Sequence, residues 1–199
     1  MGDRGGRRQA DRIVTVPNLL SLARLACIPL FLWLLFGRDD RAAAAFLLAG
    51  LGATDWLDGF VARRFDQVSS LGKVLDPTAD RLLLVVGIGS IIVADGAPAW
   101  VAWAAVVREA VVAAAAVTLA ALGARRIDVT WTGKAGTFAL MVAFPLFLAG
   151  TSDLSWAATA GDVAWIVAVP GLVLAYWAAL AYVPLARAAL AEGRVGSTT

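Results

Sequence analysis

The chain alternates between long apolar stretches and short polar joints. Apolar stretches occupy residues 16–36, 42–63, 71–94, 97–122, 135–150 and 163–185. About 20 apolar residues let an α-helix cross the hydrocarbon core of a bilayer, where only helices and closed barrels satisfy their own backbone hydrogen bonds. The pattern therefore predicts an all-α polytopic membrane protein with six transmembrane helices. The fifth stretch is short for a span and could begin as early as Trp131.

The composition agrees with a membrane location and narrows the possible chemistry. Hydrophobic residues make up 60% and charged residues 16% of the 199 residues, whereas soluble domains average about 45–50% and about 25%. Histidine is absent and Cys27 is the only cysteine, which excludes histidine catalysis, imidazole ligands and an intramolecular disulfide. Any bound metal must have oxygen ligands, which suits magnesium, manganese or calcium. We expect one domain over residues 1–199, with residues 1–12 as a basic tail.

Basic residues are distributed unevenly between the two ends of the predicted helices. One end has only Arg38 and Arg41, accompanied by several aspartates. The other end collects twelve basic residues: Arg4, Arg7, Arg8, Arg12, Arg63, Arg64, Lys73, Arg125, Arg126, Lys134, Arg187 and Arg194. Because loops rich in lysine and arginine stay in the cytoplasm, we expect both termini to be cytoplasmic.

Four aspartates interrupt the apolar pattern at the facing ends of the second and third stretches. Asp55 and Asp58 are three residues apart, and Asp76 and Asp80 are four apart, so each pair shares one helical face. A carboxylate within a membrane segment costs about 2.5–3.5 kcal/mol on insertion scales, so such a residue is first interpreted as part of a functional site. Four together repel one another unless a cation lies between them, so the arrangement indicates a divalent metal site. The alternative is a structural salt-bridge network with the basic residues Arg63, Arg64, Lys73 and Arg81.

The residues around the aspartates suit chemistry on a phosphate. Gly59 leaves the backbone bare beside Asp58, so a ligand can approach closely. Arg63 falls near the face of Asp55 and can bind a phosphate as a permanent cation. Carboxylates could hold metal ions against a pyrophosphate while one of them takes a proton from an attacking hydroxyl. The pattern therefore predicts a phosphoryl-transfer site with one or two metal ions.

This pattern resembles the signature of the CDP-alcohol phosphotransferases, a family of membrane enzymes. All its positions are filled at the family's spacing, by Asp55, Asp58, Gly59, Ala62, Arg63, Gly72, Asp76 and Asp80. The six-span layout is similar to this family over nearly the whole chain. Residues 16–24 and 133–137 resemble the bacterial phosphatidylglycerophosphate synthases and the CMP-forming cardiolipin synthases.

The resemblance implies roles for individual residues. Asp55, Asp58 and Asp76 would be metal ligands, with Asp80 both completing the metal site and acting as general base. Residues implied to contact the donor are Asn18, Ser21, Gly59, Arg63 and Ser69. The family uses magnesium or manganese, typically forms homodimers, and transfers a phosphatidyl group from CDP-diacylglycerol to an alcohol with release of CMP. We therefore expect an enzyme of phospholipid biosynthesis in a bacterial cell membrane, with a cytoplasmic active site and no nucleic-acid partner.

The acceptor alcohol is not fixed by these residues. Glycerol 3-phosphate is the favoured acceptor, because Arg108, Arg125, Arg126 and Lys134 could bind its phosphate. Phosphatidylglycerol, which would give cardiolipin, and inositol phosphate remain alternatives. For Arg108 and Glu109, a buried ion pair with a neighbouring helix is slightly favoured over a role in catalysis.

A cation transporter is the rival from a different functional class, since intramembrane aspartates can bind a transported ion. Two features argue against it. The carboxylates cluster at the edge of the predicted membrane segments and not at their middle, and inverted repeats are not evident in the sequence. Metal-dependent release of CMP would distinguish the enzyme from the transporter.

Overall fold

The structure is a computed structural model. It describes the backbone of residues 16–65, 72–121 and 130–195, and the side chains of residues 22–54, 82–119 and 130–181. Within these ranges the chain is helical, with short connections and no β-strand. The helices are α2 (Val16–Leu32), the π-helix η1 (Trp33–Gly37), α3 (Arg41–Phe65), α4 (Gly72–Val93), α5 (Ala99–Ala121), α6 (Trp131–Gly150) and α7 (Ala157–Val195).

Each of the six predicted stretches corresponds to one α-helix, which confirms the all-α class for the described residues. Helix α6 begins at Trp131 because Thr130 caps it: Thr130 Oγ1 accepts a hydrogen bond from Gly133 N at 3.3 Å. The predicted start of the last helix at residue 163 is wrong, since α7 begins at Ala157. Hydropathy marks only the apolar part of a helix, whereas the alanine-rich flanks of α7 also favour helical backbone.

A π-helical turn and an aspartate cap connect α2 to α3. The turn closes where Arg38 N donates to Trp33 O at 2.9 Å. Asp40 Oδ1 then accepts a hydrogen bond from Ala43 N at 2.9 Å, which satisfies a free N–H at the start of α3. Between them Asp39 has a φ of 52°, a left-handed conformation that aspartate adopts more readily than most residues.

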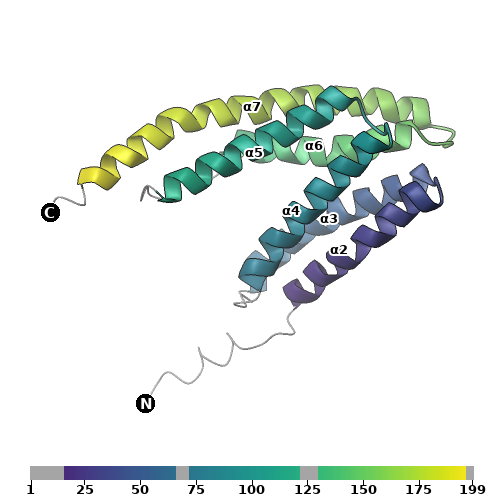
Figure 1. Cartoon of the computed structure of the whole chain (residues 1–199), viewed down its shortest axis with the longest axis horizontal. Coiled ribbons are helices and arrows are strands. Elements are labelled where there is room, and N and C mark those ends of the chain that lie inside the picture. Colours follow the sequence, from purple (N-terminus) through teal and green to yellow (C-terminus); the bar gives the residue numbers. More distant parts are fainter. Residues whose placement is uncertain (1–15, 66–71, 122–129, 196–199) are drawn as a thin grey trace, which may run out of the picture.

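The helices form two groups that meet at one end of the molecule and diverge towards the other (Figure 1). In the first group α2 packs against α3 and α4, and in the second α7 packs against α5 and α6. Contacts of α3 with α6 and of α4 with α5 join the groups. The closed end contains the α4–α5 turn, in which Gly96 N donates to Ile91 O at 2.9 Å. The open end contains the last turns of α3 and the first turns of α4 (Figure 1).

The second group is held together by very close packing of α6 against α7. A β-carbon at Gly136 would lie 2.7 Å from Ala175 N, and one at Gly171 would lie 2.7 Å from Ala139 Cβ. These small residues let the two helix backbones touch, as they commonly do in membrane proteins. The most extensive contact of the second group is therefore made by closely packed helix backbones, with α6 lying directly against α7.

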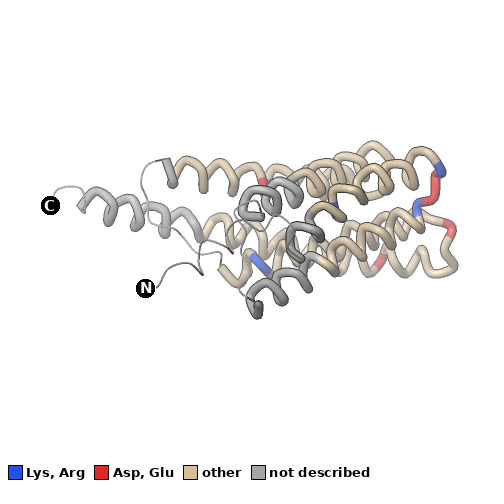
Figure 2. Tube along the Cα trace, turned by 90° about the horizontal axis from the view of Figure 1, so that it is seen from below, with Lys and Arg blue, Asp and Glu red and all other residues tan. Residues whose placement is uncertain are grey.

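The described helices have the surface of an integral membrane protein. Three are long and apolar enough to cross a membrane: Ala99–Leu119, Trp131–Gly150 and Ala157–Ala181. The described parts of α2, α3 and α4 supply the shorter apolar stretches Leu22–Gly37, Arg41–Thr54 and Leu82–Val93. Large apolar side chains such as Ile166 and Leu180 on α7 are exposed. Figure 2 shows that charged residues of the described part gather mainly at the closed end.

Candidate functional site

The four signature aspartates lie in helical backbone on both sides of the connection between α3 and α4. Asp55 and Asp58 belong to α3, whereas Asp76 and Asp80 belong to α4. Helical backbone at these positions confirms that the members of each pair share one face. Their side chains lie outside the described residues, so the joining of the two pairs into one metal site remains a prediction. Among the side chains that are described, no three His, Cys, Asp or Glu residues lie together.

Four of the five residues predicted to contact the donor belong to the first helix group. Gly59 and Arg63 are in the C-terminal half of α3, and Asn18 and Ser21 are in the first turns of α2. Their side chains lie outside the described part of the chain, as does Ser69 as a whole. The backbone positions of Gly59, Arg63, Asn18 and Ser21 place these four residues in the helix group that carries the aspartates.

The structure describes two of the four basic residues predicted to bind the acceptor. Lys134 is exposed in the first turn of α6, whereas Arg108 is buried in the middle of α5. Arg125 and Arg126 lie outside the described residues. Of the two that are described, only Arg108 lines the cavity between the helix groups.

This cavity has a volume of about 340 Å³ and walls from α3, α4, α5 and α6. Most of its lining residues are apolar. On α3 and α4 it begins at Gly52 and Leu83, which are three residues from Asp55 and Asp80 respectively. Three residues are about one helical turn, so the cavity starts directly beside the predicted metal site.

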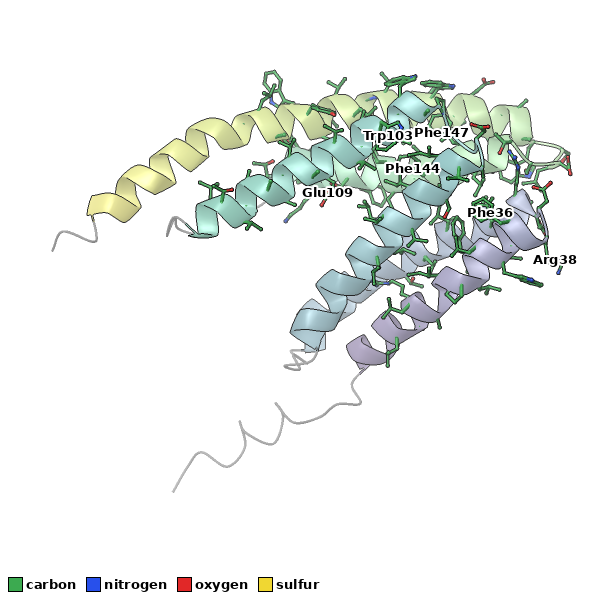
Figure 3. All side chains as sticks on the ribbon, viewed as in Figure 1. Phe36, Arg38, Trp103, Glu109, Phe144 and Phe147 are labelled. Atoms are coloured by element: carbon green, nitrogen blue, oxygen red, sulfur yellow. The ribbon has the colours of Figure 1, made fainter. Side chains whose placement is uncertain are left out.

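One end of the cavity is polar and the other is apolar. Helices α3 and α5 run towards the open end of the molecule, and α4 and α6 run away from it (Figure 1). On α5 and α6 the lining residues nearest the open end are Arg108, Glu109 and Thr137. Phe144 lies seven residues beyond Thr137, about two turns deeper. Glu109 and Phe144 mark these two levels in Figure 3.

Arg108 and Glu109 form an ion pair at the polar end of the cavity. Arg108 Nη1 lies 2.9 Å from Glu109 Oε2, and the two side chains are 9% and 39% exposed. The expectation of a partner on a neighbouring helix is therefore wrong, because the partner is the next residue of α5. Arg108 Nε is itself fully buried and has no hydrogen-bond partner among the described residues, which is uncommon for a buried donor.

Sequence reasoning did not identify Gly87, Thr137 and Met141 as lining residues. Gly87 follows Asp80 by seven residues and so shares its helical face, a spacing that could have revealed it. A β-carbon at Gly87 would touch only Leu48 Cδ1, at 3.8 Å, whereas one at Gly52 would lie 2.9 Å from Met141 Cγ. Gly87 therefore keeps the cavity open on the α4 side.

The chain is similar to known enzymes over nearly its whole length. The family model for CDP-alcohol phosphatidyltransferase matches residues 14–183. A CMP-forming cardiolipin synthase of Streptomyces coelicolor is 40% identical, over 89% of this chain and 85% of that protein. A putative cardiolipin synthase of Mycobacterium tuberculosis is 34% identical, over 86% of this chain and 82% of the relative.

A relative with a different acceptor in its name is nearly as similar. The CDP-diacylglycerol–glycerol-3-phosphate 3-phosphatidyltransferase of Escherichia coli is 35% identical, over 89% of this chain and 97% of that protein. The match of the family model and the level of identity to these relatives support one conclusion. This chain belongs to the CDP-alcohol phosphatidyltransferase family and is an enzyme of that family.

Proposed function

We propose that this enzyme transfers the phosphatidyl group of CDP-diacylglycerol to a glycerol hydroxyl of phosphatidylglycerol, forming cardiolipin and releasing CMP. The acceptor oxygen attacks the phosphorus that carries the diacylglycerol, and the bond from that phosphorus to the CMP oxygen breaks. The observation that carries the reaction class is the family match together with the complete signature on α3 and α4. The observation that carries the acceptor is the apolar cavity that begins one turn from the signature aspartates.

The carboxylates of Asp55, Asp58, Asp76 and Asp80 would hold the divalent metal that this family generally uses. The donor set fits magnesium or manganese, because the chain offers carboxylate oxygens and no histidine. When bound, such an ion would neutralise the pyrophosphate and stabilise the charge that develops as the phosphoanhydride breaks.

In the proposed reaction, side chains of the first helix group take the proton and bind the donor. Asp80 accepts the proton of the attacking hydroxyl as general base. Arg63 binds the donor diphosphate through charge-assisted hydrogen bonds, and Gly59 allows the backbone to approach the cytidine part. Asn18, Ser21 and Ser69 would complete the donor site.

The choice of phosphatidylglycerol over glycerol 3-phosphate rests on the second helix group. Glu109 offsets the charge of Arg108 at 2.9 Å, which weakens the attraction of Arg108 for a phosphorylated small acceptor. The cavity beyond this pair is apolar, which suits a lipid acceptor. Glycerol 3-phosphate is the second candidate, favoured by the Escherichia coli relative, and would use Lys134, Arg125 and Arg126 with Arg108.

We also propose the topology that the basic residues indicate. The chain would form a single domain with six spans in a bacterial cell membrane, with cytoplasmic termini and active site, and would act as a homodimer. The asymmetry of lysine and arginine supports this orientation. A cysteine introduced at Asp153 in a Cys27→Ala background should react only with reagents added from outside. Labelling from the cytoplasm would contradict the orientation.

Product analysis separates the two acceptors. Purified protein is given radiolabelled CDP-diacylglycerol, magnesium and either phosphatidylglycerol or glycerol 3-phosphate, and lipid products are identified by mass spectrometry. We expect cardiolipin and CMP from the first mixture. Formation of phosphatidylglycerophosphate alone would refute the proposed acceptor and leave the reaction class intact.

A further inference from the structure

The cavity between the helix groups has a shape and a polarity gradient that the transfer of a phosphatidyl group does not itself require. The lining residues of α4 run from Leu83 to Ile91, a separation of eight positions that corresponds to about 12 Å along the helix axis. Its volume of about 340 Å³ lies within the range of ligand sites. A space of this size lined by apolar side chains forfeits their dispersion contacts when nothing fills it.

The direction of the gradient matches a lipid that enters from the leaflet at the open end. The polar residues Arg108, Glu109 and Thr137 are the α5 and α6 lining residues nearest the aspartate end, and Ile91 and Phe144 lie deeper. A phospholipid of that leaflet has its headgroup at the aspartate level and its acyl chains pointing to the middle of the bilayer. The cavity therefore presents polar groups to the headgroup and an apolar tunnel to a chain.

We propose that this cavity is a binding site for one acyl chain of the acceptor lipid, and that Gly87 keeps it deep enough for a long chain. The inference rests on the proposed function, because it needs a lipid acceptor. The polar end of the cavity belongs to α5 and α6, whereas four of the five residues predicted to bind the donor belong to α2 and α3. For this reason the chain in the cavity is assigned to the acceptor and not to the donor.

Two glycines of α4 provide a matched pair of variants. A β-carbon at Gly87 would meet only Leu48 Cδ1, at 3.8 Å, so a side chain can begin there without a clash, and we expect a leucine to occupy part of the cavity that Gly87 lines. A β-carbon at Gly89 would meet nothing within 4 Å, and Gly89 does not line the cavity. Gly87→Leu and Gly89→Leu thus add the same side chain to the same helix, inside and outside the proposed site.

The experiment measures kcat/KM for cardiolipin formation with the full chain in detergent micelles, using dioleoyl and dihexanoyl phosphatidylglycerol as acceptors. Each methylene that loses its apolar environment lowers binding by about fourfold, so displacement of a few methylenes is readily measured. We expect Gly87→Leu to reduce the preference for dioleoyl over dihexanoyl acceptor at least tenfold, through the KM of the long-chain lipid. Gly89→Leu should keep the wild-type preference.

Three results would overturn the assignment. An unchanged preference in a folded Gly87→Leu protein would show that no acceptor chain occupies the cavity. A change that follows the chain length of CDP-diacylglycerol at constant acceptor would place the donor chain there instead. Failure of the proposed function is distinguishable, because the wild-type protein would then make no cardiolipin from either acceptor, which also removes the basis of this assignment.

A second measurement uses the wild-type protein and does not depend on how the variants fold. Phosphatidylglycerol with a diazirine in the middle of one acyl chain is photolysed with the protein, and the labelled peptides are mapped by mass spectrometry. We expect labels on residues 83–91 of α4 and 137–145 of α6, reduced by excess unlabelled phosphatidylglycerol. Labels confined to the outer surface of α7 would contradict an internal site.

Discussion

Helices α3 and α4 of the first group carry aspartates where they approach the open end, whereas α6 and α7 of the second group meet through glycine and alanine. The first arrangement is costly in a membrane and is typical of a site that binds ions. The second is typical of helices packed by van der Waals contact. The difference agrees with the proposed division of labour, in which reaction chemistry and donor binding belong to the first group and the polar end of the acceptor cavity belongs to the second, while both groups line the apolar part of that cavity.

Removal of the metal should have the largest effect, because it disables the first group as a whole. With a chelator, CMP release should fall to background and return when magnesium or manganese is added in excess. The measurement is the rate of CMP formation from CDP-diacylglycerol and phosphatidylglycerol. Undiminished turnover in EDTA would contradict an oxygen-ligated metal site.

Substitution of the proposed base should have the next largest effect. Asp80→Asn removes the proton acceptor and should lower kcat by about 10²–10⁴-fold. Asp162→Asn is the matched control, because Asp162 is an exposed aspartate of α7 outside the signature. Near-normal kcat in Asp80→Asn would remove Asp80 from its assigned role.

The packing of the second group can be broken without touching the first. Gly136→Leu forces a side chain against the backbone of Ala175, where even a β-carbon would lie 2.7 Å from the nitrogen. Overpacking of this kind costs about 1–3 kcal/mol, so the thermal midpoint in detergent should fall. Gly89→Leu serves as control, since a β-carbon there meets nothing within 4 Å. Equal midpoints would show that α6 can move away from α7 freely.

A hydrogen bond between α5 and α7 should make the smallest contribution. Tyr176 donates from its hydroxyl to Ala104 O at 2.9 Å, and Tyr176→Phe removes only this donor. Its loss should cost about 0.5–1.5 kcal/mol of stability with little change in kcat. A large fall in kcat would mean that the second helix group contributes more to the reaction than the proposed division between the two groups allows.

Much of the fold could be predicted from the sequence because the apolar stretches are long and their joints are polar. The exact ends of the helices were less predictable, because hydropathy does not mark the residues that cap a helix. Thr130, for example, fixes the start of α6 by a side-chain cap. The close approach of α3 and α6 at Gly52, where a β-carbon would lie 2.9 Å from Met141 Cγ, emerges only from the structure. The cavity was not predictable, because it depends on the angle between two helix groups.

The candidate site was predictable to the extent that its chemistry is local in sequence. Fixed spacing along helices placed the aspartate pairs, and the family match supports an enzyme over the cation transporter. The partner of Arg108 was misjudged because a buried charge usually pairs across helices, whereas here the adjacent Glu109 reaches it. Apolar lining residues carry no chemical signature, so their role emerges only from the packing of four helices.

The division between the groups is tested most directly by measuring the KM of each substrate for two arginine variants. Arg63→Gln, on the first group, should raise the KM of CDP-diacylglycerol at least tenfold and leave that of phosphatidylglycerol nearly unchanged. Arg108→Gln, on the second group, should do the reverse, because it removes the guanidinium group that lines the polar end of the cavity. If both variants raise the KM of the same substrate, the two helix groups do not divide donor and acceptor between them.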